Sequence, residues 1–351
     1  MTGLGSYLGA SILVLGTVFS HASLAAESPK PMDYLQDLAG EKGIGARVAG
    51  SEGEQRAAAY IEQQWIDQGL SPYSSSFNIN DETLSKNIIV DLKGQSDKTL
   101  IIAAHYDSTG AKEGSVGATD NASSVAALLA LSHNLRNQML TVNIRFIAFG
   151  AEEIGLLGSK AYVKQLSREE LANIVGMINL DTIVGGDNLY IHSAHPEPYK
   201  CGGDAQYYSS DTSLRDSVLK QAQSGFTPNP FSKHPPFPGY PEGTTGGWSD
   251  HAPFACAGVP IAYIEATNFS INGKDGYDGY SQSTNGALWD CFADDKMSAC
   301  DREKEQKWGD IWHSEFDRLD KLLPLFGERI ELQLQQNIQL LTDFVSANYT
   351  Q

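Results

Sequence analysis

The chain has 351 residues, of which 25 are basic and 43 acidic, and its formal net charge is −18. Hydrophobic residues make up 41% and charged residues 19%, which is typical of a folded globular protein and excludes a largely disordered one. The negative charge argues against nucleic acids and anionic membrane surfaces as partners, because both attract basic patches.

The first 26 residues are typical of a secretory signal peptide. An apolar run over 8–19 is too short to span a bilayer, and the small residues before Glu27 suit a signal peptidase. No basic residue precedes Lys30, so the positive segment that usually begins such a peptide is missing. We therefore expect a signal peptide at 1–26, a mature chain at 27–351 without a membrane span, and a periplasmic or secreted protein.

Helix and strand patterns alternate along the mature chain. In chain order they predict a helix over 50–69, strands over 86–92 and 99–104, a helix over 121–135, a strand over 141–149, a helix over 156–166, strands over 174–180 and 188–192, a helix over 211–223, a strand over 261–265 and a helix over 328–349. This alternation predicts one α/β domain with a mostly parallel central sheet and helices on both faces.

Two long stretches interrupt the alternation, and each is too long for an ordinary connection. The first long stretch, 195–248, contains most of the prolines of the mature chain, and the second, 268–310, is polar and rich in Gly, Asp and Tyr. Long loops of this kind are often functional, so we expect these two to form walls of the functional site.

The cysteines fit an oxidising compartment, since none lies in a CxxC pair and zinc binding is not indicated. Cys291 and Cys300 close a short polar loop and are the favoured disulfide. Cys256 lies in an apolar segment, where a buried free thiol is equally consistent with the sequence.

Ionisable side chains cluster at the ends of the predicted strands. They are His105, Asp107, Asp120, Glu152, Glu153 and Asp181, and His313 adds to them from far along the chain. Taken singly, each has an ordinary explanation: an Asp before a helix is usually an N-cap, and a Glu pair usually begins a solvated helix. Together they point to one site, because open α/β sheets bind ligands at the carboxyl ends of their strands. Histidine and carboxylate ligands suit zinc, and the set suffices for two ions.

Six segments resemble, in order, the motif series of the co-catalytic di-zinc aminopeptidases. They are AAHYDST, GATDNASSVAALL, FIAFGAEEIGLLGSKAY, MINLDTI, SDHAPFACAGVP and WHSEFDRLD. Within this family, NLDTIVGGDNLYIHS and YIEATNFSINGKDGY resemble the exported alkaline phosphatase isozyme conversion aminopeptidases, which trim a basic residue from a periplasmic protein. The resemblance implies a zinc-exopeptidase fold that removes N-terminal residues from peptides or proteins.

The resemblance also implies how the metal ligands are shared. His105 and Asp181 would hold one zinc ion, Glu153 and His313 would hold the other, and Asp120 would bridge both.

Further roles follow from the same resemblance. Glu152 would be the general base that takes a proton from the metal-bound water, and Asp107 would orient His105 through its second ring nitrogen. The peptide bond between Asp120 and Asn121 would be cis.

One pair in SDHAPF needs a separate interpretation. His251 is a second candidate for the distant zinc ligand, but the resemblance gives that role to the WH position. We expect Asp250 and His251 to lie behind the ligands or to line the substrate pocket, and a helix N-cap by Ser249 or Asp250 is the alternative.

Three other functions are compatible with the same fold. A glutaminyl cyclase generally works with one zinc ion, whereas this chain keeps ligands for two. A carboxypeptidase needs a basic cluster for the substrate carboxylate, and none is evident in the sequence. A non-catalytic binding relative has usually lost ligands, and here none is lost.

Acidic residues of the second long stretch favour a substrate with a basic first residue. They are Asp275, Asp278, Asp290, Asp294, Asp295 and Asp301. The alternative explanation is that this acidity only keeps an exported protein soluble. Selectivity requires at least one carboxylate buried in the pocket, because exposed charge pairs contribute only roughly 0–1 kcal/mol each.

Overall fold

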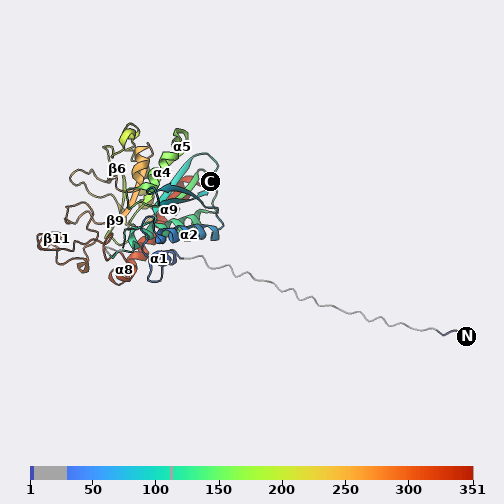
Figure 1. The fold of residues 1–351 in the computed structure, drawn as a ribbon, viewed down its shortest axis with the longest axis horizontal. Helices are drawn as coiled ribbons and strands as arrows, with labels where there is room; N and C mark the ends of the chain where they lie inside the picture. The colour runs from blue at the N-terminus through green and yellow to red at the C-terminus, as the bar shows by residue number, and fades with distance from the viewer. Residues whose placement is uncertain (4–29, 111–113, 351) are drawn as a thin grey trace.

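The computed structural model describes residues 1–3, 30–110 and 114–350 (Figure 1). The apolar run of the expected signal peptide lies outside the described residues. Among the residues that are described, no helix is long and apolar enough to cross a membrane.

A nine-stranded mixed sheet forms the centre of the molecule. Its strands are β1 (Tyr73–Asn78), β2 (Leu84–Leu92), β3 (Thr99–His105), β4 (Asn143–Phe149), β5 (Ile174–Leu180), β6 (Asn188–Ala194), β7 (Phe231–Ser232), β8 (Thr244–Thr245) and β9 (Ile261–Thr267). Their order is β1-β2-β4-β3-β5-β9-β6-β7, with β8 paired to β6. The central strands β4, β3, β5 and β9 are parallel, whereas β2 and β6 join them antiparallel. The predicted mostly parallel sheet is therefore confirmed at its centre.

Helices cover both faces of this sheet, as predicted, and α4 and α5 lie on the opposite side from α1 and α2 (Figure 1). The helices are α1 (Pro31–Ala39), α2 (Glu52–Asp67), α3 (Ser123–Leu135), α4 (Leu157–Gln165), α5 (Arg168–Asn173), α6 (Ser213–Gly225), α7 (His251–Cys256), α8 (Leu319–Phe326) and α9 (Glu328–Tyr349). Short segments complete the fold: η1 (Ala118–Ala122), η2 (Gly202–Tyr207), η3 (Gly286–Leu288) and the hairpin β10 (Phe292–Ala293) and β11 (Ser298–Ala299).

The alternation of side chains along the strands divides the core into two layers. On β3, Leu100, Ile102 and Ala104 contact the layer that contains α1, α2, α3, α6 and α9. Ile101 and Ala103 point to the other face and contact the layer of α4 and α7. Because neither face of β3 meets water, this strand is apolar at nearly every position, which is the pattern of a buried parallel strand.

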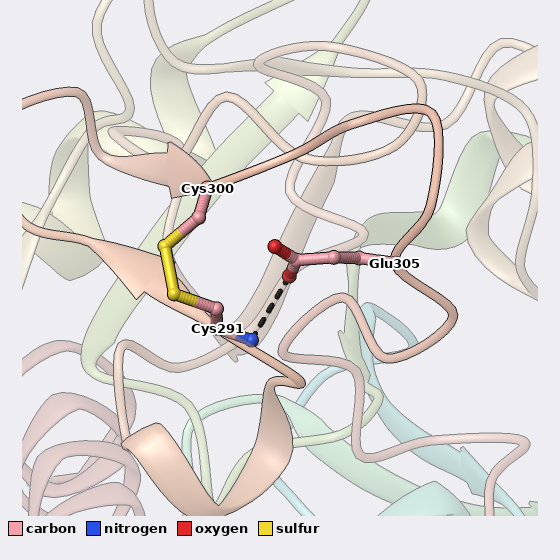
Figure 2. Close-up of side chains that lie close together, drawn as sticks. All are labelled: Cys291, Cys300 and Glu305. Carbon is pink, nitrogen blue, oxygen red and sulfur yellow. Dashed lines mark hydrogen bonds between the residues drawn. A yellow bond between two sulfur atoms is a disulfide. The ribbon is translucent and has the colours of Figure 1, made fainter.

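Two disulfides hold the long stretches, one within the second stretch and one between the first stretch and α7. Cys291–Cys300 is the predicted one, and Figure 2 shows it beside Glu305. The backbone N–H of Cys291 donates to the Glu305 carboxylate at 2.9 Å. The sulfurs are bonded to each other, so this group of side chains is no metal site. Cys201 is bonded to Cys256, and the free-thiol interpretation of Cys256 is therefore wrong.

Candidate active site

A cavity of about 610 Å³ opens at the carboxyl ends of the central strands. Six of the seven predicted site residues line it: His105, Asp120, Glu152, Glu153, Asp181 and His313. They come from the end of β3, from η1, from the turn after β4, from the end of β5 and from the loop before α8. The fold thus brings residues from five separate segments to one place, and three of these segments are strand ends, as the strand-end argument predicts.

Asp120 lies between two histidines and faces each with a different oxygen. Its Oδ1 is 3.1 Å from His105 Nε2, and its Oδ2 is 3.0 Å from His313 Nε2. The side chain is nearly buried, with 4% of its surface exposed. One carboxylate is therefore placed to serve two binding positions.

Each of these two positions has one more carboxylate. Asp181 Oδ1 lies 3.5 Å from His105 Nε2, and Glu153 Oε2 lies 3.1 Å from His313 Nε2. Glu152 also lies close to His105 and Asp181, with ligand atoms of all three within 4.8 Å of one another. The result is two His–carboxylate groups that share Asp120.

The cluster concentrates negative charge in a place shielded from water. Burial raises the pKa of Glu152 well above its ordinary range, and burial together with the Asp120 charge raises the pKa of Glu153 to about 7. Burial would also raise the pKa of Asp120, but hydrogen bonds to His105 and His313 hold it below its usual value. Buried carboxylates of this number need compensating cations, and a His–carboxylate donor set fits divalent zinc.

Asp107 lies beneath the cavity and holds two parts of the cluster. Its Oδ1 accepts the backbone N–H of Glu152 at 2.9 Å, and its Oδ2 accepts that of Glu153 at 3.2 Å. On the other side, His105 Nδ1 lies 3.2 Å from the Asp107 carbonyl oxygen and 3.5 Å from its carboxylate. Asp107 therefore fixes both the ring of His105 and the turn that carries the two glutamates.

Unusual backbone conformations adjoin the site residues. Ala151, Thr182 and His313 have left-handed φ angles of 53°, 50° and 56°, which residues other than glycine adopt uncommonly. Ala151 directly precedes Glu152 and Glu153, and Thr182 directly follows Asp181. Uncommon backbone conformations of this kind are typical of functional sites, where the surrounding structure holds them in place. The peptide bond after Asp120 is cis, as the sequence resemblance implied.

Two buried residues that were not predicted support the loop around Asp120. The guanidinium of Arg47 is fully buried and donates to the carbonyls of Tyr106 and Gly117, among others. Asp317 accepts both the backbone N–H and the hydroxyl of Thr119. Asp317 belongs to the recognised WHSEFDRLD segment, which was a usable signal, whereas nothing in the sequence around Arg47 indicates that it is buried.

Asp250 and His251 lie behind the cavity rather than on its wall. Both are fully buried and neither lines the cavity, so of the two expected positions the one behind the ligands agrees with the structure and the one on the pocket wall does not. His251 Nε2 is 2.7 Å from the Gly246 carbonyl oxygen, away from the carboxylate cluster. Asp250 stands at the start of α7 without a capping hydrogen bond from its side chain, which also argues against the N-cap alternative.

Both long stretches contribute to the walls of the cavity, as expected. The first supplies Phe237, Tyr240 and Trp248, and the second supplies Asp278 and Tyr280. Most of this surface is aromatic, so the cavity combines an apolar wall with a charged floor.

The acidic residues expected in the pocket are mostly elsewhere. Asp278 is the one that lines the cavity; Asp290, for example, accepts the backbone N–H groups of Gln306 and Lys307 within its own loop. Asp275, Asp294, Asp295 and Asp301 do not line the cavity either. A carboxylate not foreseen from the sequence, Glu265 of β9, does line it and is only 7% exposed.

The sequence matches one protein family, and the structure matches solved structures of one fold. Residues 87–330 match peptidase family M28. The chain is 30% identical over 294 residues to the alkaline phosphatase isozyme conversion protein of Escherichia coli, an alignment covering 76% of this chain and 81% of that protein. It also matches longer proteins, of whose length it spans 51% and 53%.

Solved structures with the same fold include proteins of two activities. A zinc aminopeptidase from Bacillus subtilis superposes with a TM-score of 0.65 at 18% identity, covering 93% of this chain and 96% of that one. A glutaminyl cyclase from Fimbriiglobus ruber superposes with a TM-score of 0.61 at 16% identity, covering 91% and 94%. At sequence identities this low, the structural similarity shows only that the fold is shared, and the activity has to be inferred from the residues of the site.

Proposed function

Because the chain belongs to peptidase family M28, we propose that it is a zinc-dependent aminopeptidase that removes N-terminal residues from peptides or proteins. The observation that carries this proposal is the position of Asp120, whose two oxygens face His105 and His313 separately. The names of similar proteins, an isozyme conversion protein and a zinc aminopeptidase, support it.

Two zinc ions fit the donor set. His105 and Asp181 would hold one, Glu153 and His313 the other, and Asp120 would contribute one oxygen to each. Zinc bound there would polarise the scissile carbonyl and lower the pKa of the attacking water.

The protein's own contribution to the reaction lies chiefly in Glu152. Its carboxylate lines the cavity beside the ligand cluster and would take the proton of the attacking water, then deliver it to the leaving amine. Asp107 would keep this carboxylate and His105 in fixed relative positions through the hydrogen bonds described above.

Recognition of an N-terminus follows from the charge of the cavity. The carboxylates on its floor would attract the α-ammonium group of the substrate, and a cavity of about 610 Å³ has room for one terminal residue. The aromatic wall would cover the side chain of that residue.

A preference for a basic first residue is the finer part of the proposal. Glu265 is a buried carboxylate on the cavity wall, and burial raises its pKa to about 8. Its Oε1 lies 3.0 Å from His192 Nδ1, yet makes no hydrogen bond of good geometry with a described residue. A guanidinium or ammonium group would supply the missing partner and favour the ionised carboxylate, and Asp278 would add a second charge at the rim.

The other functions of this fold receive less support. Ligands for two ions disfavour a glutaminyl cyclase, which generally uses one, and an intact cluster with Glu152 in place disfavours a non-catalytic relative. A count of zinc per purified chain separates these classes: about two, one or none.

We also propose that the protein is exported to the periplasm or secreted. The signal-peptide pattern over 1–26 and the two disulfides support this, since disulfides persist in oxidising compartments. Cell fractionation and mass determination test it: we expect the protein outside the cytoplasm with residues 1–26 removed, and retention of the full-length chain in the cytoplasm would contradict it.

A panel of aminoacyl p-nitroanilides tests the main proposal. We expect hydrolysis of substrates with a free α-amine, loss of activity with a zinc chelator and recovery on adding zinc. An N-acetylated substrate serves as the control and should not be cleaved. Activity that survives the chelator, or that requires a blocked N-terminus, would contradict the proposal.

Replacing Glu265 with glutamine tests the basic preference. The ratio of kcat/KM for Arg and Leu p-nitroanilides should fall about 10- to 100-fold, because a charged hydrogen bond to the Arg side chain is lost. Glu303→Gln, at an exposed site in the second long stretch, removes the same charge and should keep the ratio. If Leu is preferred already in the wild type at both low and high salt, the basic preference is refuted.

A further inference from the structure

A second hollow adjoins the catalytic cavity. It has a volume of about 640 Å³ and lies between α4, α5, α7 and the beginning of the first long stretch. Leu156, Lys160 and Gly247 line both hollows, so the two are neighbours across these residues. A peptide whose first residue occupies the catalytic cavity would reach the second hollow by passing over these shared residues.

This hollow is basic although the protein is strongly acidic. Its cations are Lys160, Lys164, Arg168 and Lys200, and we call it the basic pocket. Among the described residues that line it, Asp204 supplies the single carboxylate, which lies 3.4 Å from the Arg168 guanidinium. Four cations against one anion are notable in a chain with 25 basic and 43 acidic residues.

The four basic side chains differ in how far they are already engaged by described residues. Arg168 stacks on the ring of Tyr207 at 3.5 Å, and Lys160 Nζ donates to the Gly155 carbonyl at 2.8 Å. Within the described part of the chain, neither Lys164 nor Lys200 forms an ion pair with a carboxylate. The pocket therefore carries positive charge that its own walls do not neutralise.

The walls of the basic pocket are fixed in place by covalent and helical structure. The Cys201–Cys256 disulfide joins the first long stretch to α7, and both cysteines line the pocket next to Lys200. On α4, Lys160 and Lys164 are four residues apart and so lie on one face of the helix. The backbone positions of these residues are therefore fixed, while the exposed lysine side chains can adjust to an anion.

We propose that the basic pocket binds carboxylate groups of the substrate downstream of the bond that is cut, either acidic side chains or the C-terminal carboxylate of a short peptide. The proposal rests on the aminopeptidase function proposed above, because it needs the N-terminus to lie in the catalytic cavity. It makes the enzyme selective on both sides of the scissile bond. The lysines act here as point charges that attract carboxylates rather than as groups that touch the reacting atoms.

The basic pocket also bears on the carboxypeptidase alternative, which requires a basic cluster that the sequence did not reveal. Of its four cations, Lys160 is the only one that also lines the catalytic cavity among the described residues. The other three line the basic pocket alone and do not stand beside the metal-binding residues of the catalytic cavity. This arrangement suits a longer substrate held by its N-terminus.

The test uses the zinc-loaded enzyme and peptides that share the N-terminal sequence Leu-Ala. One ends in Glu-Glu, one in Gln-Gln and one in Gln-Gln amide, so that side-chain and C-terminal carboxylates are varied separately. For Lys164→Gln/Lys200→Gln, we expect KM for the Glu-Glu peptide to rise about threefold to tenfold relative to the Gln-Gln amide, with kcat little changed. Raising the ionic strength should reduce the wild-type preference in the same way.

A matched control removes the same charge elsewhere. Lys93→Gln/Lys321→Gln replaces two exposed lysines outside the basic pocket and should leave the peptide preference as in the wild type. Equal effects of the two double variants, or equal KM for all three peptides in the wild type, would overturn the proposed pocket. Failure of the wild type to release Leu from any of these peptides and to hydrolyse Arg p-nitroanilide would instead refute the aminopeptidase function. Removal of C-terminal residues from an N-acetylated peptide would favour a carboxypeptidase.

Discussion

The Glu152→Gln variant is expected to lose about 10²- to 10⁴-fold in kcat on every aminoacyl substrate while keeping its full zinc content. Glutamine has nearly the same shape as glutamate but cannot accept a proton from the attacking water. The change leaves the backbone N–H of residue 152 free to keep its hydrogen bond to Asp107. Steady-state kinetics and metal analysis of the same preparation measure both quantities.

The neighbouring glutamate provides the control. Glu153 Oε2 lies 3.1 Å from His313 Nε2, so Glu153→Gln should lower the zinc content as well as the activity. Both variants replace a glutamate with glutamine at adjacent positions and remove the same charge. A difference between them in zinc content therefore reports the different roles of the two side chains. Activity of Glu152→Gln within about tenfold of the wild type would contradict a general base at this position.

The elements that carry the site could be predicted because their signals are local. β3 is an apolar run that ends on His105, and β5 is an apolar run followed directly by Asp181. Parallel pairing then places these two residues at the same edge. His313 lies far along the chain from both, and no local rule connects it to Asp120. Its place was predicted only through the resemblance of the WHSEFDRLD segment.

What could not be predicted depends on tertiary contacts. Arg47 precedes α2 in a segment with no motif, yet it is fully buried and holds the loop before Asp120. Glu265 lies inside an apolar strand, and β9 could have turned it to either face. The acidic residues of the second long stretch are more numerous and therefore suggested a pocket more strongly than Glu265 did. A carboxylate in a loop can instead accept backbone N–H groups of the same loop, as Asp290 does from Gln306.

Asp120→Asn is expected to reduce binding at both metal positions, whereas His313→Ala should reduce binding at one. The two oxygens of Asp120 lie 3.1 Å from His105 Nε2 and 3.0 Å from His313 Nε2, so one substitution weakens two donor sets. Losing His313 leaves His105, Asp120 and Asp181 together. We therefore expect well under one zinc ion per chain in the first variant and about one in the second, against about two in the wild type.

Two further variants show whether such losses are specific. Asp91→Asn removes a carboxylate that pairs with Arg145 on β4, outside the cavity, and should keep both ions. His251→Ala removes a buried histidine whose Nε2 faces the Gly246 carbonyl, and it should also keep both ions provided that its melting temperature shows a folded protein. If His251→Ala lost an ion and His313→Ala did not, the distant ligand would be misassigned. Equal loss in Asp120→Asn and His313→Ala would mean that the two positions fill only together, and Asp120 would then have no special role as the shared ligand.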